Sequence, residues 1–370
     1  MSVVEQARDV VLGAIEQRTF PGASVDVGES HGALWREVFG TTAFAPASPR
    51  TSLPTPLATP PATTEATLYD LASLTKVVAT TTVIMDLVGS GLARLDDRIA
   101  DSFPEWRGTD REGVTVQDLL EHASGLPARL LEAPPATRRE FEHDICTMRL
   151  AYPPRTKSIY SDLGFILLGM LAEARGGATL DRQFDAIRVR LGVAESLLAG
   201  KHLTFKLSGS TKGRAAPTMP QDDDARRGRI LTGEVHDNYA AALGGVAGHA
   251  GLFGTAAAMG AFARLVLRAA RGGAVPPPLS STGVARFTRK SAVPGSSRAL
   301  GWDTMLPTSS CGTRMSAGAI GHVGFTGTSL WIDPPRDRYF VLLSNRVANG
   351  GTLDEMRSIR RSFHDALATL

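Results

Sequence analysis

The chain has 370 residues, of which 43% are hydrophobic, and its 40 basic residues nearly balance 37 acidic ones, for a net charge of +3. A chain of this length can bury a large core in one or two structural units, and the balanced charge, with no basic and aromatic stripe, excludes nucleic acid as an expected partner. Two cysteines, Cys146 and Cys311, provide no disulfide framework.

The N-terminal part of the chain indicates a helix followed by a strand pair. A helix is expected over Val3–Arg18, and strands over Gly22–Gly28 and Ala33–Gly40. The first residues carry acidic and basic side chains and no long apolar segment, so they do not resemble a signal peptide, and no stretch reaches about 18 uninterrupted apolar residues. We therefore expect a cytoplasmic protein without a membrane span. Ala45–Thr64, rich in Pro, Ser, Thr and Ala, is predicted to be a loop.

The next segment holds Ser73 and Lys76 at the opening turn of a predicted buried helix that continues through the apolar run Val77–Val88. Residues three apart lie on one helix face, so the hydroxyl and the amine can meet. A serine is a poor nucleophile without a nearby base, and a lysine can serve as that base only if burial lowers its pKa. Helix N-terminal N–H groups would favour the oxyanion that follows attack on an acyl carbon. The alternative is a helix N-cap followed by an ordinary lysine.

A second polar segment contains Tyr160 and Asp162, after a proline-containing loop at residues 153–154. Asp162 is predicted to cap an apolar helix over Phe165–Ala174. The tyrosine could point its phenol into a cleft, with the short acidic side chain two positions on at the same side. The alternative is a tyrosine packed under a loop and an aspartate that only caps the helix.

Glycine-rich segments follow at residues 233–238 and 243–251, and they contain His236, Asp237 and His249. The glycines suit a tightly folded loop that lets the backbone approach a ligand or another segment. These three side chains could recognise a substrate in the cleft, or they could bond the local backbone. No metal site is expected, because the chain has no His-Glu-x-x-His and no paired Cys motif, and no cofactor motif is present.

The last distinctive segment, residues 322–333, begins with His322, Val323 and Gly324 and is predicted to be a glycine-rich edge strand that leads into an alternating strand. Glycine inside a strand often marks the close approach of another backbone or a ligand. A bulged edge strand with a surface histidine is the alternative. Strands over Leu330–Asp333 and Tyr339–Ser344 and an amphipathic helix over Thr352–Leu370 complete the chain.

The order of these elements predicts an α+β fold. Early and late strands would form one antiparallel sheet, flanked by the terminal helices, and the segment between them would form a mainly helical lobe. The sheet lobe is expected at about residues 1–68 and 290–370 and the helical lobe at about 69–289, with a cleft between them.

The ordered motifs Ser73-x-x-Lys76, Tyr160-x-Asp162 and His322-x-Gly324 resemble those of the serine β-lactamase and penicillin-binding-protein superfamily, in its class C-like serine hydrolase branch. The segments Leu119–Pro127 and Gly251–Ala256 also resemble that family, and the likeness spans roughly residues 10–365. The resemblance implies a single β-lactamase/transpeptidase-like catalytic domain over residues 1–370.

The resemblance also implies a division of roles. Ser73 would be the acylated nucleophile, and Lys76 and Tyr160 would share its proton, one of them acting as base. The backbone N–H groups of Ser73 and of Phe325, on the edge strand, would form the oxyanion hole. His322 would line the cleft and hydrogen-bond Tyr160 or the substrate.

Three positions depart from the best-known members of that family. His322 and Val323, before Gly324, replace a lysine and a hydroxyl residue, and Asp162 replaces the commoner asparagine. Lost positive charge and added negative charge would weaken binding of an anionic β-lactam. If an imidazolium at His322 did hold an anionic substrate, kcat/KM for such substrates should fall as pH rises through about 6–7.

We therefore expect a serine hydrolase that acts through a Ser73 acyl-enzyme on an ester, an amide or a D-amino-acid-containing peptide, with weak or no β-lactamase activity. Asp162, His322, Gly324, His236, Asp237 and His249 are the candidate substrate-binding residues. The alternative is a catalytically silent protein that recognises a peptidoglycan fragment. The expected partner is a small molecule or short peptide, cell-wall fragments included; the sequence leaves the oligomeric state open.

Overall fold

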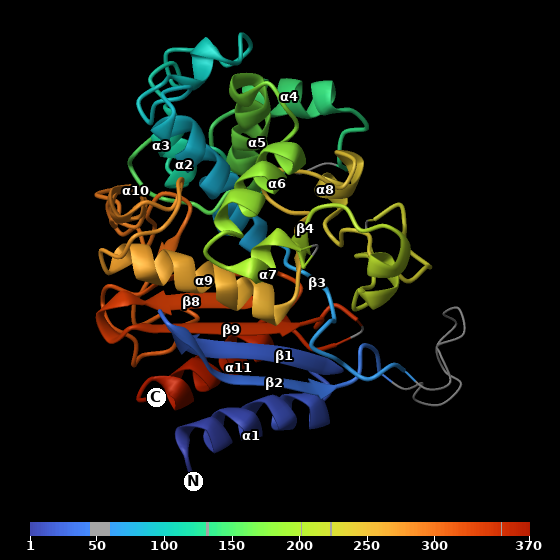
Figure 1. The fold of residues 1–370 in the computed structure, drawn as a ribbon. Coiled ribbons are helices and arrows are strands. Elements are labelled where there is room, and N and C mark those ends of the chain that lie inside the picture. Colours follow the sequence, from blue (N-terminus) through green and yellow to red (C-terminus); the bar gives the residue numbers. More distant parts are fainter. Residues whose placement is uncertain (45–59, 131–132, 201, 223, 349) are drawn as a thin grey trace.

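The fold is given by a computed structural model, which describes residues 1–44, 60–130, 133–200, 202–222, 224–348 and 350–370. Its main feature is a six-stranded antiparallel sheet in the order β2-β1-β9-β8-β7-β6 (Figure 1). Both chain ends contribute strands: β1 (Gly22–Glu29), β2 (Gly32–Gly40), β6 (Asp303–Thr304), β7 (Ile320–Val323), β8 (Ser329–Asp333) and β9 (Arg338–Ser344). Strand β1 pairs with β9, so the predicted sheet built from both chain ends is confirmed. Residues 45–59 of the predicted loop lie outside the described residues.

Helices cover both faces of this sheet (Figure 1). The terminal helices α1 (Val3–Glu16) and α11 (Leu353–Leu367) pack together on one face, and α9 (Ala256–Ala270) packs on the other. Both terminal helices begin with capping boxes, in which a hydroxyl and a glutamate satisfy backbone N–H groups reciprocally. Because both faces are covered, β1 and β8 are buried along nearly their whole length.

A mainly helical lobe lies on the α9 side of the sheet, as expected (Figure 1). The remaining elements are η2 (Lys76–Thr80), α2 (Thr81–Gly89), η3 (Ile99–Asp101), α3 (Val116–Leu120), α4 (Arg138–Thr147), α5 (Asp162–Gly176), α6 (Leu180–Leu191), α7 (Ser196–Ala199), η4 (Gly209–Arg214), α8 (Asn238–Ala242), α10 (Ser281–Phe287) and η5 (Pro334–Arg336). The strands β3 (Tyr69–Asp70), β5 (Phe253–Gly254) and β4 (Leu203–Thr204) form a small three-stranded sheet.

Two local predictions are wrong. Residues 322–333 do not form an edge strand that continues into an alternating one: β7 ends at Val323, a turn follows, and β8 is buried on both faces. The turn closes because the Gly324 N–H donates to the Thr328 carbonyl. Asp162 does not cap α5; the Ser161 side chain accepts from the Gly164 N–H, and Asp162 is the first helical residue.

The chain buries two main hydrophobic cores. One lies within the helical lobe and extends to the α9 face of the sheet, and the other fills the space between the sheet and α1 and α11. Within the described ranges no single helix is both long and apolar enough to cross a membrane; α5 and α6 satisfy that criterion together but are bent by 74° at the break between them.

Candidate active site

Ser73 stands in a strained turn, and two helical residues separate it from the π-helical segment η2. Ala72 has φ of +47°, a left-handed conformation that is unusual for a residue with a side chain, and the Asp70 carboxylate stabilises it by accepting from the Ala72 N–H at 2.8 Å. Lys76 follows as the first residue of η2, and its Nζ donates to the Ser73 Oγ at 3.1 Å. The serine and lysine predicted to meet on one face do meet.

Tyr160 approaches the same hydroxyl from the loop before α5. Its phenol donates to the Ser73 Oγ at 2.7 Å. His122 holds this loop in place, because its Nδ1 accepts from the Ser161 N–H at 3.0 Å and its ring packs 4.8 Å from the Tyr160 ring. Sequence analysis had identified His122 only as part of a family-like segment and missed this positioning contact.

Lys76 lies in a closed set of charged contacts, here called the Lys76 network. Its Nζ, which is fully buried, donates to Asp162 at 2.7 Å and to the His249 carbonyl at 3.0 Å. Arg129 bridges Asp162 at 3.2 Å and Asp237 at 2.9 Å. Asp237 in turn contacts the His249 Nε2 at 2.7 Å. The network is closed because the His249 carbonyl accepts from Lys76. The network joins segments more than 80 residues apart in sequence, including Lys76 and Asp162.

The network determines which groups near Ser73 carry charge. Burial lowers the pKa of Lys76, but the Asp162 carboxylate and Tyr160 raise it by more, so the pKa lies above its ordinary value. Burial raises the pKa of the Tyr160 phenol, against the opposing effect of Lys76. The sequence analysis required that burial lower the pKa of Lys76 for it to act as a base. This condition is not met, because the Asp162 carboxylate raises the pKa by more than the loss of hydration lowers it.

The turn between β7 and β8 is fastened to the segment before Ser73. The Thr326 hydroxyl donates to the Asp70 carbonyl at 2.7 Å, and the Thr328 hydroxyl donates to the Leu71 carbonyl at 3.1 Å. A Cβ atom on Gly324 would lie 2.6 Å from the Leu71 carbonyl oxygen, so only glycine allows this approach. The predicted close backbone approach at this glycine is confirmed.

Phe325 follows in the turn and not on a strand, contrary to the sequence prediction. Within the part of the chain that the structure describes, neither its backbone N–H nor that of Ser73 donates a hydrogen bond. Two N–H groups on adjoining backbone segments are thus available to an incoming oxygen atom.

His322 is buried against Tyr160, with ring centroids 5.8 Å apart. Its Nδ1 lies 2.8 Å from the Val323 carbonyl, and the structure shows no hydrogen bond to Tyr160. Burial, with Arg298 and Lys76 nearby, lowers the pKa of His322 well below its ordinary value. The ring is therefore neutral near pH 7, and an imidazolium at this position is not expected to hold an anion.

These residues surround a cavity of about 430 Å³. Its walls include Ser73, Tyr160 and Phe325. They also include all six candidate substrate-binding residues: Asp162, His236, Asp237, His249, His322 and Gly324. The His236 ring stacks on Phe325 with centroids 5.6 Å apart, and neither ring nitrogen has a partner within the described residues. Burial lowers the pKa of His236 to about 4, so this ring is also neutral.

Three arginines in the cavity wall were missed by sequence analysis: Arg129, Arg298 and Arg360. The Arg298 guanidinium lies 5.3 Å from the centre of the Tyr160 ring. None of the three belongs to a recognisable motif, since each reaches the cavity through tertiary packing. The pocket therefore contains positive charge that the motif residues alone did not indicate.

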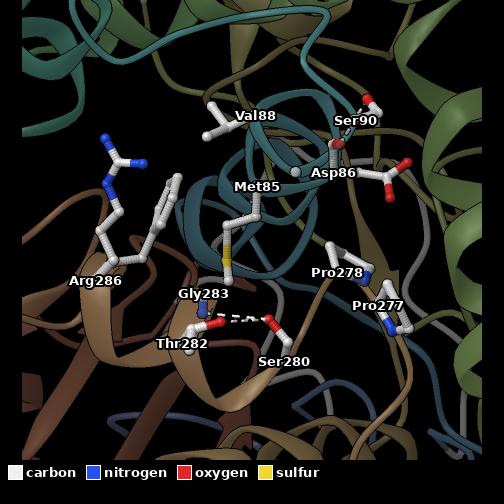
Figure 2. A pocket seen from close by; sticks show the side chains of 12 residues that line it. Met85, Asp86, Val88, Ser90, Pro277, Pro278, Ser280, Thr282, Gly283 and Arg286 are labelled. Carbon is white, nitrogen blue, oxygen red and sulfur yellow. Dashed lines mark hydrogen bonds between the residues drawn. The ribbon is translucent and has the colours of Figure 1, made fainter.

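A second cavity, of about 490 Å³, lies between α2 and α10 (Figure 2). Its wall includes Asp86, Arg286 and a pair of hydroxyls, Ser280 and Thr282, whose oxygens are 3.4 Å apart. None of the predicted site residues lines it. Among the described residues, no group of three His, Cys, Asp or Glu side chains is arranged to hold a metal ion. The cavity at Ser73 is therefore the candidate active site.

The sequence matches a protein-family model and resembles curated proteins along most of its length. A family model described as Beta-lactamase matches residues 6–363. A "Putative D-alanyl-D-alanine carboxypeptidase" of Escherichia coli (strain K12) is 32% identical over 314 residues, which cover 76% of this chain and 70% of the relative.

Solved structures share the fold at low sequence identity. EstCE1, described as a hydrolase with promiscuous acyltransferase activity, superposes with a TM-score of 0.71 at 18% identity, covering 98% of each chain. A class C beta lactamase from Rhodobacter sphaeroides gives 0.70 at 19% identity, again over 98% of each chain.

Proposed function

Because the chain belongs to the beta-lactamase family of serine hydrolases, we propose that it hydrolyses an ester, an amide or a D-amino-acid-containing peptide through an acyl-enzyme on Ser73. The observation that carries the proposal is the convergence of Lys76 Nζ and the Tyr160 phenol on the Ser73 Oγ, at 3.1 and 2.7 Å. A serine becomes an effective nucleophile when neighbouring groups can take its proton.

In the proposed reaction, the Ser73 Oγ attacks the acyl carbon and its proton passes to the Tyr160 and Lys76 pair. The N–H groups of Ser73 and Phe325 bind the oxyanion. When the intermediate collapses, the bond to the leaving group breaks and that group takes the proton. Water then hydrolyses the acyl-enzyme and restores the serine hydroxyl.

The pKa shifts indicate which form of the enzyme reacts. Since the pKa values of Lys76 and Tyr160 both lie above their ordinary values, the resting pair holds an ammonium and a phenol. The reactive form has one proton fewer, shared between two groups that titrate together. The proposed activity therefore rises with pH towards the alkaline range.

The substrate class is proposed from the wall of the cavity. The name of the Escherichia coli relative favours peptides that contain D-amino acids, and the neutral His236 and His322 rings can exchange hydrogen bonds with amide or ester groups. Asp162, Gly324, Asp237 and His249 are proposed to shape the same cavity. Weak or no β-lactamase activity remains part of the proposal, because a neutral His322 and Val323 stand where the best-known members have a lysine and a hydroxyl residue.

Intact mass spectrometry tests the proposal. The protein and its Ser73→Ala variant would be incubated separately with a fluorophosphonate and with a penicillin. A fluorophosphonate adduct that forms on the parent and not on the variant supports a serine hydrolase. If penicillin also forms an adduct with the parent, the proposed weak reactivity with β-lactams is contradicted. The absence of any adduct on folded protein would contradict the proposed function and favour a silent binding protein.

A further inference from the structure

The peptide group between Gly324 and Phe325 is held by a buried arginine. The Arg360 Nη2 donates to the Gly324 carbonyl at 2.6 Å and to the Thr328 carbonyl at 2.8 Å. The Gly324 carbonyl and the Phe325 N–H belong to one rigid planar unit. A bond that orients this carbonyl therefore also orients the proposed oxyanion donor.

A second arginine holds the next carbonyl. The Arg346 Nη2 donates to the Phe325 carbonyl at 2.8 Å, and its guanidinium lies 4.9 Å from the centre of the Phe325 ring. Phe325 is thus fixed on both sides by guanidinium groups that come from different segments, one on α11 and one after β9. Here the two are called the arginine pair.

The arginine pair is buried without a matching acid. Arg360 is 5% exposed and Arg346 is 7% exposed. Among the described residues, no carboxylate lies within salt-bridge distance of either guanidinium, and the Nε of each has no partner. Burial lowers the pKa of Arg360 to about 9, with Arg346 contributing, and burial also lowers the pKa of Arg346. A buried charge is normally paired, so this arrangement leaves positive charge to be neutralised.

In the proposed reaction, the tetrahedral intermediate carries a negative charge on its oxygen, and this charge can neutralise the arginine pair. Hydrogen bonds from a charged donor are stronger than neutral ones, and in a buried site they polarise the groups they contact. Polarising the Gly324 carbonyl makes the Phe325 N–H a better donor. The same positive charge attracts an oxyanion and has little effect on a neutral substrate, which is the condition for lowering a reaction barrier.

We propose that Arg360 and Arg346 are positioning residues of the oxyanion hole. Arg360 orients and polarises the Gly324–Phe325 peptide group, Arg346 holds the following Phe325–Thr326 peptide group in place, and both lend their charge to the oxyanion. The inference rests on the proposed function, since it assumes a Ser73 acyl-enzyme. It extends that function to two residues outside the three motifs, neither of which needs to touch the substrate.

The test compares a neutral substrate with a transition-state analogue. Arg360→Met, Arg360→Lys and Arg346→Met would be assayed with p-nitrophenyl acetate, and their inhibition by phenylboronic acid, which forms a tetrahedral anion on a serine, would be measured. Arg357→Met is the matched control, since Arg357 is an exposed residue of the same helix whose guanidinium donates to the Thr308 carbonyl. Melting temperatures would be recorded for every variant.

We expect Arg360→Met to lower kcat about 10- to 100-fold, less than the 10²–10³ typical of losing an oxyanion donor outright. KM should change less than about threefold, and the inhibition constant of the boronic acid should rise by a factor similar to the loss in kcat. Arg360→Lys should recover part of the loss, and Arg357→Met should behave like the parent.

Unchanged kcat, or a lower kcat with unchanged boronic acid affinity, would overturn the inference. Should Arg360→Met fail to fold, Arg346→Met decides by the same criteria, because it removes support from the neighbouring carbonyl. A parent protein that forms no Ser73 adduct overturns the proposed function and the inference together. A reactive parent with fully active variants overturns the inference alone.

Discussion

At the scale of single residues, Lys76 shows how one neighbour decides a protonation state. Its side chain is fully buried in an apolar helix, which on its own favours a neutral amine. Asp162, at 2.7 Å, reverses that preference. Asparagine, commoner at this position in the family that the motifs resemble, would offer a similar shape without the charge.

Asp162→Asn is therefore expected to lower the pKa of Lys76. Loss of the carboxylate removes stabilisation of the ammonium, so the deprotonated form becomes populated at lower pH. The alkaline rise of kcat/KM should move to lower pH by about 1 unit or more, as measured with p-nitrophenyl acetate between pH 6 and 10. Asp303→Asn, in the same cavity wall but outside the Lys76 network, should leave the profile in place. A profile unmoved by Asp162→Asn would show that Asp162 does not set the pKa of the base.

His322 leads to a second prediction about pH. Because the pKa of its ring lies well below the ordinary value, the ring stays neutral between pH 6 and 8. The ratio of kcat/KM for an anionic ester, p-nitrophenyl hydrogen succinate, to that for p-nitrophenyl acetate should then remain constant over this range. A ratio that falls as pH rises through 6–7 would instead indicate an imidazolium that binds the anion.

At the scale of elements, the site depends on the contact of two turns. One precedes η2 and presents Ser73; the other joins β7 to β8 and presents Phe325. Two threonine hydroxyls, on Thr326 and Thr328, tie the second turn to backbone carbonyls of the first. The distance between the two proposed oxyanion donors is thus set by side chains that need not touch a substrate.

Gly324→Ala should disrupt this contact. The added methyl group would lie 2.6 Å from the Leu71 carbonyl and also against the Thr328 side chain, and a backbone oxygen cannot easily move away. We expect the rate of Ser73 modification by a fluorophosphonate to fall about 10²–10³-fold, the loss associated with one oxyanion donor.

Gly318→Ala is the control for this change. Gly318 lies shortly before β7, and an added Cβ would approach only the Pro335 ring, at 3.3 Å or more. Its modification rate should equal that of the parent. If Gly324→Ala reacted equally fast, the close approach of the two turns would not be needed for the activity.

At the scale of the whole molecule, a buried polar cluster joins the sheet to α9. Asp26 on β1 is fully buried and accepts from the Tyr339 phenol and from Arg36 Nε, each at 2.6 Å. Arg264 on α9 donates to the same phenol at 2.9 Å. Gly260 makes this approach possible, because any side chain there would collide with the Asp26 carboxylate.

Asp26→Ala should destabilise the protein by about 2 kcal/mol, since the buried Tyr339 phenol loses its charged hydrogen-bond acceptor. The decrease would be measured by urea unfolding. Glu29→Ala, which removes a partly exposed ion pair with Arg338, should cost less than about 1 kcal/mol. Ser73 modification should be unchanged in both variants at temperatures below unfolding. Equal losses in the two variants would contradict a structural role for the buried cluster.

The sequence by itself determined most of the local elements and the identity of the candidate reactive groups. The i, i+3 spacing of Ser73 and Lys76 brings them together on any helix, and the alternation and turn residues at both chain ends specify strands that need partners. The order of three short motifs was enough to indicate the family. Each of these properties depends on neighbours in the chain, which the sequence displays directly.

Only the tertiary structure decided the charge at the site. Asp162 contacts Lys76, which is 86 positions away, and Arg360 contacts Gly324, which is 36 positions away. The motifs predicted that Lys76 and Asp162 share a site but not that they form an ion pair, and Arg360 belongs to no motif. Burial made His322 neutral although its sequence context suggested a strand edge. The protonation state of a side chain depends on all the charged and polar groups around it. Folding brings those groups together from distant segments, and their separation along the chain does not give their distance in space.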